Sequence, residues 1–127
     1  MRAVLVPIIT VCSFLYLQLG IAGAEDAPAW IVGEYAGTAS PPKIGNINIQ
    51  IQIKDVSLTE VLYRNDRNLR DWTKVRAEAK SVSPDRVKLS IVLPTGTSYD
   101  LVAKPDGSME GTLYGTLGSE SIRFTKK

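Results

Sequence analysis

The sequence contains no histidine, and its single cysteine is Cys12, near the start of the chain. Histidine is the commonest general base in enzymes and, together with cysteine, the usual ligand of transition metals. No Ser-His or Cys-His catalytic site can therefore be built, and residues 25–127 have no thiol for a disulfide. We expect no enzymatic activity, no catalytic residues, no metal site and no cofactor.

A strong charge of one sign is also missing. Fifteen Lys and Arg residues stand against 13 Asp and Glu residues, which gives a formal net charge of +2. Proteins that bind nucleic acids or anionic membrane surfaces usually carry a clear positive excess. The stretch GTLYGTLG (111–118) has glycines but lacks the strand, helix and lysine of a phosphate-binding loop. We therefore expect no nucleic acid as partner.

The only long apolar run lies at the start, where Met1-Arg2 is followed by AVLVPIITVCSFLYLQLGIAGA without a further charge. It ends in Ala22-Gly23-Ala24, which fits the A-x-A pattern of a signal-peptidase site. We predict a signal peptide over residues 1–24, a single domain over 25–127, and a periplasmic or secreted protein with no membrane contact after cleavage. The alternative is an uncleaved anchor, because about 20 apolar residues can span a bilayer.

Apolar and polar residues alternate with a period of two over most of the remaining chain, and this pattern is typical of half-buried strands. Proline and glycine fall between the alternating runs, where the chain must reverse. We predict an all-β antiparallel meander of about eight strands that closes, or nearly closes, into a barrel, with a small β-sandwich as the alternative. The expected strands cover residues 32–38, 46–54, 61–64, 74–80, 87–93, 99–103, 109–115 and 122–124.

Residues 71–80, DWTKVRAEAK, are the ambiguous segment. Trp72, Val75 and Ala79 have helical spacing, and Asp71 could cap a helix. A strand would instead place Val75, Ala77 and Ala79 inward and the charged residues outward. We favour the strand, whereas a helix near residues 66–80 would make the fold α+β.

Residues 46–54 read NINIQIQIK, in which isoleucine alternates with uncharged amides. Exposed edge strands are normally protected by lysine, proline or bulges, and this one is not. We therefore predict an internal strand with its isoleucines in the core. Two alternatives are an amide surface that binds a sugar or a protein backbone, and an outer-membrane barrel with the isoleucines facing lipid.

The turns also predict strand registers. A Pro105-Asp106-Gly107 turn sets small residues opposite large ones, as does a loop centred on Ser83-Pro84. Such alternation fills the interior of a small barrel and argues against a large hydrophobic ligand chamber. The expected pairs are Ala103 with Met109, Leu101 with Gly111, Tyr99 with Leu113, Ala79 with Val87, and Ala77 with Leu89.

Gly33-Glu34-Tyr35 resembles the G-x-W element of lipocalin-type barrels, with tyrosine in place of tryptophan. In those barrels a basic residue of the last strand lies over the aromatic ring, and the resemblance implies Arg123 for that position. It covers four positions and carries over no binding residues.

Residues 64–74, RNDRNLRDWTK, are the most charged stretch and the best candidate site. Arginines beside aromatic residues can bind carboxylate-rich surfaces, because guanidinium groups bind bidentately and stack. The alternative is a solvated loop with Trp72 in the core. The candidate partner-binding residues are Arg64, Arg67, Arg70, Trp72, Lys74, Tyr63 and Tyr35.

From these residues we predict a non-enzymatic interaction module, of inhibitor or accessory type, that recognises another extracytoplasmic protein through surface loops. The alternative is a carrier that binds a small ligand in the mouth of the barrel. The sequence predicts no particular oligomeric state.

Overall fold

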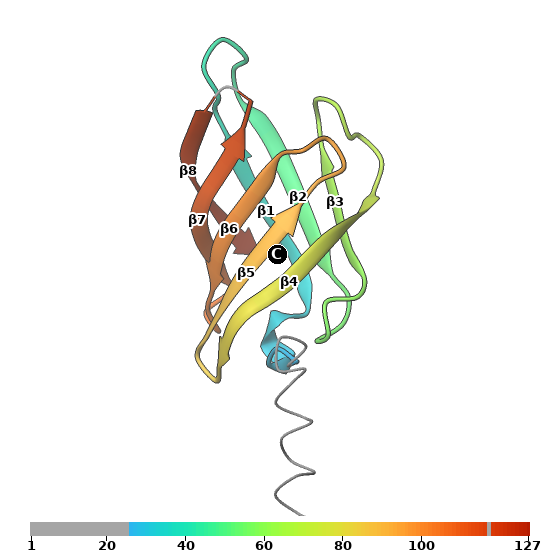
Figure 1. Ribbon diagram of the computed structural model, residues 1–127, viewed down its shortest axis with the longest axis vertical. Helices are drawn as coiled ribbons and strands as arrows, with labels where there is room; N and C mark the ends of the chain where they lie inside the picture. The colour runs from blue at the N-terminus through green and yellow to red at the C-terminus, as the bar shows by residue number, and fades with distance from the viewer. Residues whose placement is uncertain (1–25, 117) are drawn as a thin grey trace, which may run out of the picture.

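The computed structural model describes residues 26–116 and 118–127, and the predicted signal peptide lies outside this part of the chain. Eight antiparallel strands form a closed barrel in the order in which they occur along the chain (Figure 1). Each strand pairs with its neighbours in sequence, and β8 returns to pair with β1. The predicted all-β meander and its closure into a barrel are thus confirmed, and the β-sandwich alternative is wrong.

The strands occupy all the segments in which apolar and polar residues alternate. A short 3-10 helix, η2 (Ala29–Ile31), precedes the first strand. No helix in the described residues is both long enough and apolar enough to cross a membrane. The strands are β1 (Gly33–Ala39), β2 (Ile47–Ile53), β3 (Val61–Asn65), β4 (Thr73–Ser83), β5 (Arg86–Val92), β6 (Ser98–Ala103), β7 (Ser108–Gly115) and β8 (Gly118–Lys126).

The NINIQIQIK segment becomes β2, an internal strand that pairs with β1 on one side and β3 on the other. Its isoleucines are buried in the core, and its amide side chains lie on the outer face. A closed barrel leaves no free edge, which explains how this strand can do without protective charges.

The ambiguous segment forms β4, so the alternative of a helix near residues 66–80 is wrong. β4 pairs with both β3 and β5, and Val75 is buried while Ala77 and Ala79 pack against the core. Pairing with two neighbouring strands and burial of one face outweigh the helical preference of alanine, glutamate and lysine, which is worth only tenths of a kcal/mol per residue.

The predicted register of β6 and β7 is confirmed at all three pairs, including Tyr99 opposite Leu113. The predicted register of β4 and β5 is wrong by two residues, because Ala79 lies opposite Leu89 and Ala77 opposite Ile91. The turn here consists of Pro84 and Asp85, one residue further along than expected, and an irregularity between Ala79 and Ser81 shifts the pairing again. Small residues still oppose large ones.

One end of the barrel is closed by η2, which lies across it at the bottom of Figure 1. The Tyr35 hydroxyl donates to the carbonyl oxygen of Ile31 over 2.8 Å. Lys126 Nζ donates to the carbonyl oxygen of Trp30 over 2.7 Å and lies 5.9 Å from the centroid of the Tyr35 ring. These contacts fasten η2 to the first and last strands.

The expectation that Arg123 lies over the Tyr35 ring is therefore wrong, and Lys126 takes that position. The reason is strand alternation, because Arg123 faces outward, where its guanidinium pairs with Glu110 at 3.0 Å. Lys126 is the residue of β8 that lies opposite Tyr35 in the register of β1 and β8.

Candidate functional site

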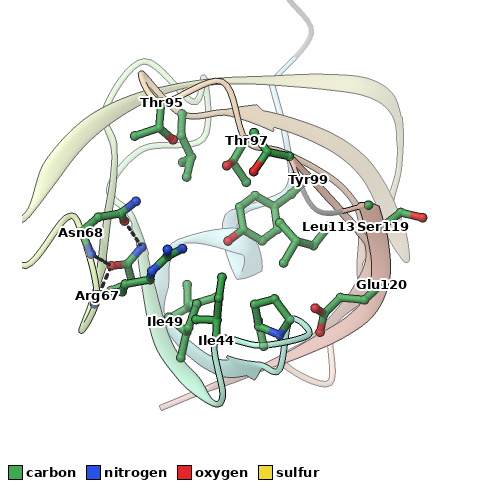
Figure 2. A pocket seen from close by; sticks show the side chains of 18 of the residues that line it. Ile44, Ile49, Arg67, Asn68, Thr95, Thr97, Tyr99, Leu113, Ser119 and Glu120 are labelled. Atoms are coloured by element: carbon green, nitrogen blue, oxygen red, sulfur yellow. Dashed lines mark hydrogen bonds between the residues drawn. The ribbon is translucent and has the colours of Figure 1, made fainter.

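The other end of the barrel is open and contains a cavity of about 140 Å³ (Figure 2). Its walls come from the loop 40–46 between β1 and β2, the loop 66–72 between β3 and β4, the loop 93–97 between β5 and β6, and the facing ends of β7 and β8. A dry cavity of about 150 Å³ can hold benzene, so this one has room for a single ring or a short branched chain.

One part of the cavity wall is apolar. Ile47, Ile49 and Leu113 are inward-facing residues of β2 and β7, and Ile44 from the first loop joins them. The hydroxyl groups of Thr95, Thr97 and Ser119 lie around the rim. The cavity therefore combines an apolar side with polar groups at its mouth, which is the usual composition of a small-molecule site.

The floor of the cavity is formed by two buried tyrosines from β3 and β6. Tyr63 is 2% exposed and Tyr99 is 1% exposed. Their hydroxyl oxygens lie 2.8 Å apart, within hydrogen-bonding distance. Tyr99 also makes an edge contact with Phe124, at 6.0 Å between ring centroids. The ring packing holds both hydroxyl groups in place beneath the mouth.

Asn65, at the end of β3, connects the floor to the loop 66–72. Its Oδ1 accepts hydrogen bonds from the backbone N–H groups of Arg67, Asn68 and Leu69, at 2.9, 2.8 and 3.1 Å. Because three donors converge on one atom, that atom must be the oxygen, and the amide orientation is settled. Asn65 Nδ2 then donates to the Tyr63 hydroxyl over 3.2 Å and to Asn68 Oδ1 over 3.1 Å.

The tyrosine pair has one hydrogen more than its hydrogen bonds use. The Tyr63 oxygen already receives a hydrogen from Asn65, and only one hydrogen can lie between the two phenols. If Tyr63 donates to Tyr99, the Tyr99 hydrogen is left over, and if Tyr99 donates, the Tyr63 hydrogen is left over. Either way, one phenolic hydrogen has no acceptor among residues 26–116 and 118–127. Hydrogen bonds in a chain strengthen one another, which favours the order Asn65 to Tyr63 to Tyr99.

Both phenols stay protonated at physiological pH. Burial raises the pKa of Tyr63, although its hydrogen bonds to Tyr99 and Asn65 oppose the change. Burial also raises the pKa of Tyr99, and the neighbouring Tyr63 and the carboxylate of Glu120 raise it further. A phenol that holds its proton this firmly is a hydrogen-bond donor and not a base or nucleophile.

Two opposite charges face each other across the mouth. Arg67 extends from the loop 66–72, and in Figure 2 its guanidinium and the Tyr99 hydroxyl point toward one another. Glu120 of β8 approaches from the other side, and its Oε2 accepts a hydrogen bond from the backbone N–H of Ser40 over 2.9 Å. Within the described part of the chain Arg67 makes no ion pair.

The candidate residues from the sequence lie in three places. Tyr63 and Arg67 belong to the cavity, at its floor and its rim. Tyr35 lies at the closed end of the barrel, far from the cavity. Because it is buried, it cannot contact a partner at the surface. The remaining candidates lie on the outside of the barrel wall near β3 and β4, and these are Arg64, Arg70, Trp72 and Lys74.

The outer group contains a stacked pair. The Arg64 guanidinium carbon lies 4.4 Å from the Trp72 ring centroid, and its Nε donates to Gln50 of β2. Trp72 is half-buried against the wall, while Arg70 and Lys74 are exposed. Asp66, from the same loop, accepts hydrogen bonds from the backbone and side chain of Asn48, which ties the loop to β2.

Sequence reasoning missed Asn65, Tyr99 and Glu120 as site residues. A signal existed for the first two. Asn65 follows a strand and precedes a polar turn, where asparagine commonly accepts backbone N–H groups. Tyr63 and Tyr99 both have the strand parity of core residues, and a buried tyrosine hydroxyl needs a partner. Nothing in the sequence places Glu120 opposite Arg67, because that depends on barrel closure.

Comparisons of the chain with models of known protein families, with curated proteins and with solved structures find no match. The functional conclusion therefore depends on the site.

Proposed function

We propose that this protein is a non-enzymatic, periplasmic or secreted binding protein that holds a small ligand in the open end of its barrel. The observation that carries the proposal is a buried phenolic hydrogen, at the floor of the cavity, that has no acceptor within residues 26–116 and 118–127. Buried polar groups in proteins are nearly always hydrogen-bonded. This phenolic hydrogen is therefore suited to bind an acceptor atom of a ligand.

The packing of the barrel limits the size of the ligand. Toward the closed end the interior is filled by fully buried side chains, among them Ile51, Leu101, Met109 and Phe124. A long lipid chain has no space between them. The proposed ligand is therefore a compact molecule that enters only the upper part of the barrel.

Native mass spectrometry of the protein, expressed as the full chain and purified gently from an extracytoplasmic fraction, tests this proposal. We expect a retained small mass whose removal lowers the melting temperature, because a ligand bound only by the native state stabilises it. Thr97→Trp places a large side chain in the mouth and should abolish retention. Val92→Trp is the matched control, since Val92 lies on the outer face of the neighbouring strand.

Retention of the same mass by the Thr97→Trp variant would contradict binding in the cavity. So would a wild-type protein that carries no small molecule and whose melting temperature is unchanged by the small-molecule extract of the same fraction.

Recognition of another extracytoplasmic protein through the loop 66–72 and its neighbours is the second candidate function. The observation that favours it is the Arg64–Trp72 stack, with Arg70 and Lys74 exposed beside it. The two functions separate experimentally, because Arg70 lies outside the cavity and Arg67 at its rim. Arg70→Ala should weaken capture of a protein partner at unchanged melting temperature, and unchanged capture would remove this surface from consideration.

A further inference from the structure

We infer that the ligand of this cavity carries a carboxylate, which Arg67 and the free phenolic hydrogen of the tyrosine pair bind, and a compact apolar body that packs against Ile44, Ile49 and Leu113. The inference rests on the proposed function and adds the chemical class of the ligand.

The phenolic hydrogen at the cavity floor is a donor, so a ligand that binds there must supply an acceptor. Asn65 Oδ1 is saturated by three backbone N–H groups, and both hydrogens of Asn65 Nδ2 are used within the protein. In the cooperative order of hydrogen bonds, the Tyr99 oxygen accepts from Tyr63, and the Tyr99 hydrogen has no acceptor in the described part of the chain. A ligand group at this position must therefore offer an oxygen or another acceptor.

The rim distinguishes an anionic acceptor from a neutral one. The Arg67 guanidinium carries a positive charge and offers only hydrogen-bond donors, in a fork that matches a carboxylate. Arg67 and Tyr99 line the same cavity, and in Figure 2 the guanidinium points toward the Tyr99 hydroxyl. In the inferred complex, one oxygen of the ligand carboxylate accepts from the phenol and the other from the guanidinium. Hydrogen bonds to charged groups are about twice as strong as neutral ones.

The apolar side of the cavity determines the rest of the ligand. Ile49 and Leu113 are buried residues of β2 and β7, and Ile44 from the loop 40–46 lines the same cavity and packs against the core. A volume of about 140 Å³ accommodates one ring or a short branched chain beside the carboxylate. Aromatic or short-chain carboxylic acids fit this combination.

Glu120 controls the orientation of such a ligand. Its carboxylate lies across the mouth from Arg67 and is held by the backbone N–H of Ser40. A ligand carboxylate is repelled from that side and directed toward Arg67. Removal of the Glu120 charge should therefore strengthen the binding of an anion and leave the binding of a neutral ligand unchanged.

Titration of the protein, expressed as the full chain, with two acids and their neutral amides tests the inference. The probes are benzoate with benzamide, and 3-methylbutanoate with 3-methylbutanamide, and the readouts are calorimetry and backbone amide chemical shifts around the cavity. We expect each acid to bind about tenfold more tightly than its amide, because a charge-assisted bond adds about one decade in affinity.

Single variants separate the contributions of Arg67, the phenolic hydrogen and Glu120 to ligand affinity. Arg67→Gln should remove the preference for acid over amide, whereas Arg70→Gln, on the same loop but outside the cavity, should retain it. Tyr99→Phe should weaken acid and amide alike, since both offer an oxygen to the phenol, whereas Tyr63→Phe leaves the Tyr99 hydrogen in place and should weaken both much less. Glu120→Gln should tighten binding of the acids roughly twofold to fivefold, as expected for a partly exposed charge.

Equal affinities for acids and amides, or a preference that survives Arg67→Gln, would overturn this inference and leave the proposed ligand-binding function standing. If none of the probes binds and no chemical shift near the cavity changes, the inference and the proposed function fail together.

Discussion

Replacement of Asn65 by alanine tests the link between the fold and the site. The side chain makes five hydrogen bonds, of which three hold the backbone of residues 67–69 and one holds the Tyr63 hydroxyl. Asn65→Ala removes all of them from a position that is only 8% exposed. The loop 66–72 then loses the anchor that positions Arg67 at the rim.

The magnitude follows from the surroundings of each bond. Arg67 and Asn68 are exposed, so water partly replaces the lost acceptor, and the three backbone bonds contribute about 0.5 kcal/mol each, the low end of the usual range. The bond to the buried Tyr63 hydroxyl contributes about 1 kcal/mol, and the fifth bond, to the side chain of the exposed Asn68, adds little because water replaces it. The expected loss of unfolding free energy is about 2.5 kcal/mol, or about 10 to 20 °C in melting temperature for a domain of this size.

Asn65→Asp is the matched control. One oxygen of its carboxylate still accepts hydrogen bonds from the three backbone N–H groups. The other oxygen replaces Nδ2, so it accepts the hydrogen of the Tyr63 hydroxyl, whereas Nδ2 donates to that hydroxyl in the wild type. We therefore expect a loss of stability of less than half that of the alanine variant. Tyr99 must then donate to Tyr63, so no phenolic hydrogen remains for a ligand, and affinity for a carboxylate should fall in a folded protein.

Urea denaturation followed by tryptophan fluorescence measures the unfolding free energy of both variants. Calorimetry with benzoate measures their affinity for a carboxylate. An alanine variant within about 0.5 kcal/mol of wild type would refute the assigned role of Asn65, because surface substitutions without structural effect fall in that range. An aspartate variant as unstable as the alanine variant would refute the assignment of the amide oxygen.

Three further predictions concern other parts of the barrel. Gly37→Ala should lower stability by about 2 kcal/mol or more in urea denaturation, because the added Cβ would lie 2.5 Å from the carbonyl oxygen of Arg123, and a wild-type midpoint would contradict this. Burial raises the pKa of Tyr35 from 10.0 to about 12, so the native state retains a proton that the unfolded chain releases. Stability should therefore fall between pH 10 and 12, and a flat urea midpoint over that interval would be inconsistent. Lys126→Met loses the bond to the η2 carbonyl and should cost about 1 to 2 kcal/mol by thermal denaturation. Lys127→Met, which removes only an exposed ion pair, should cost less than about 1 kcal/mol, and equal losses would show that Lys126 does not hold η2 in place.

The strands were predictable because each buries one face only, so burial appears in the sequence as strict alternation. The isoleucines of β2 and the register set by the Pro105-Asp106-Gly107 turn are examples, since both depend on neighbouring residues alone. The register of β4 and β5 was not predictable in the same way. An irregularity such as the one after Ala79 depends on how the strand bends around the barrel, and no local residue pattern marks it.

The candidate site was predictable only in part. Arg67 and Tyr63 stood out as an arginine and an aromatic residue in a charged segment, and both belong to the cavity. Tyr99 and Glu120 lie on strands that reach the same cavity only when the sheet closes, so their partnership is a tertiary property. The prediction of Arg123 over Tyr35 failed because Arg123 is three residues from Lys126, and an odd separation along a strand puts two side chains on opposite faces.

The pairing of β1 with β8 has a consequence for how the protein folds. Every other strand pair joins consecutive segments, so these contacts form locally and at small cost in chain entropy. The last pairing joins residues near the two ends of the described chain, and it consists of only three residue pairs, Tyr35 with Lys126, Ala36 with Thr125 and Gly37 with Phe124. We therefore expect this closure to be a late kinetic step. Until it occurs, β1 and β8 are free strand edges that can pair with another chain, so slower closure should appear as concentration-dependent loss of refolding yield.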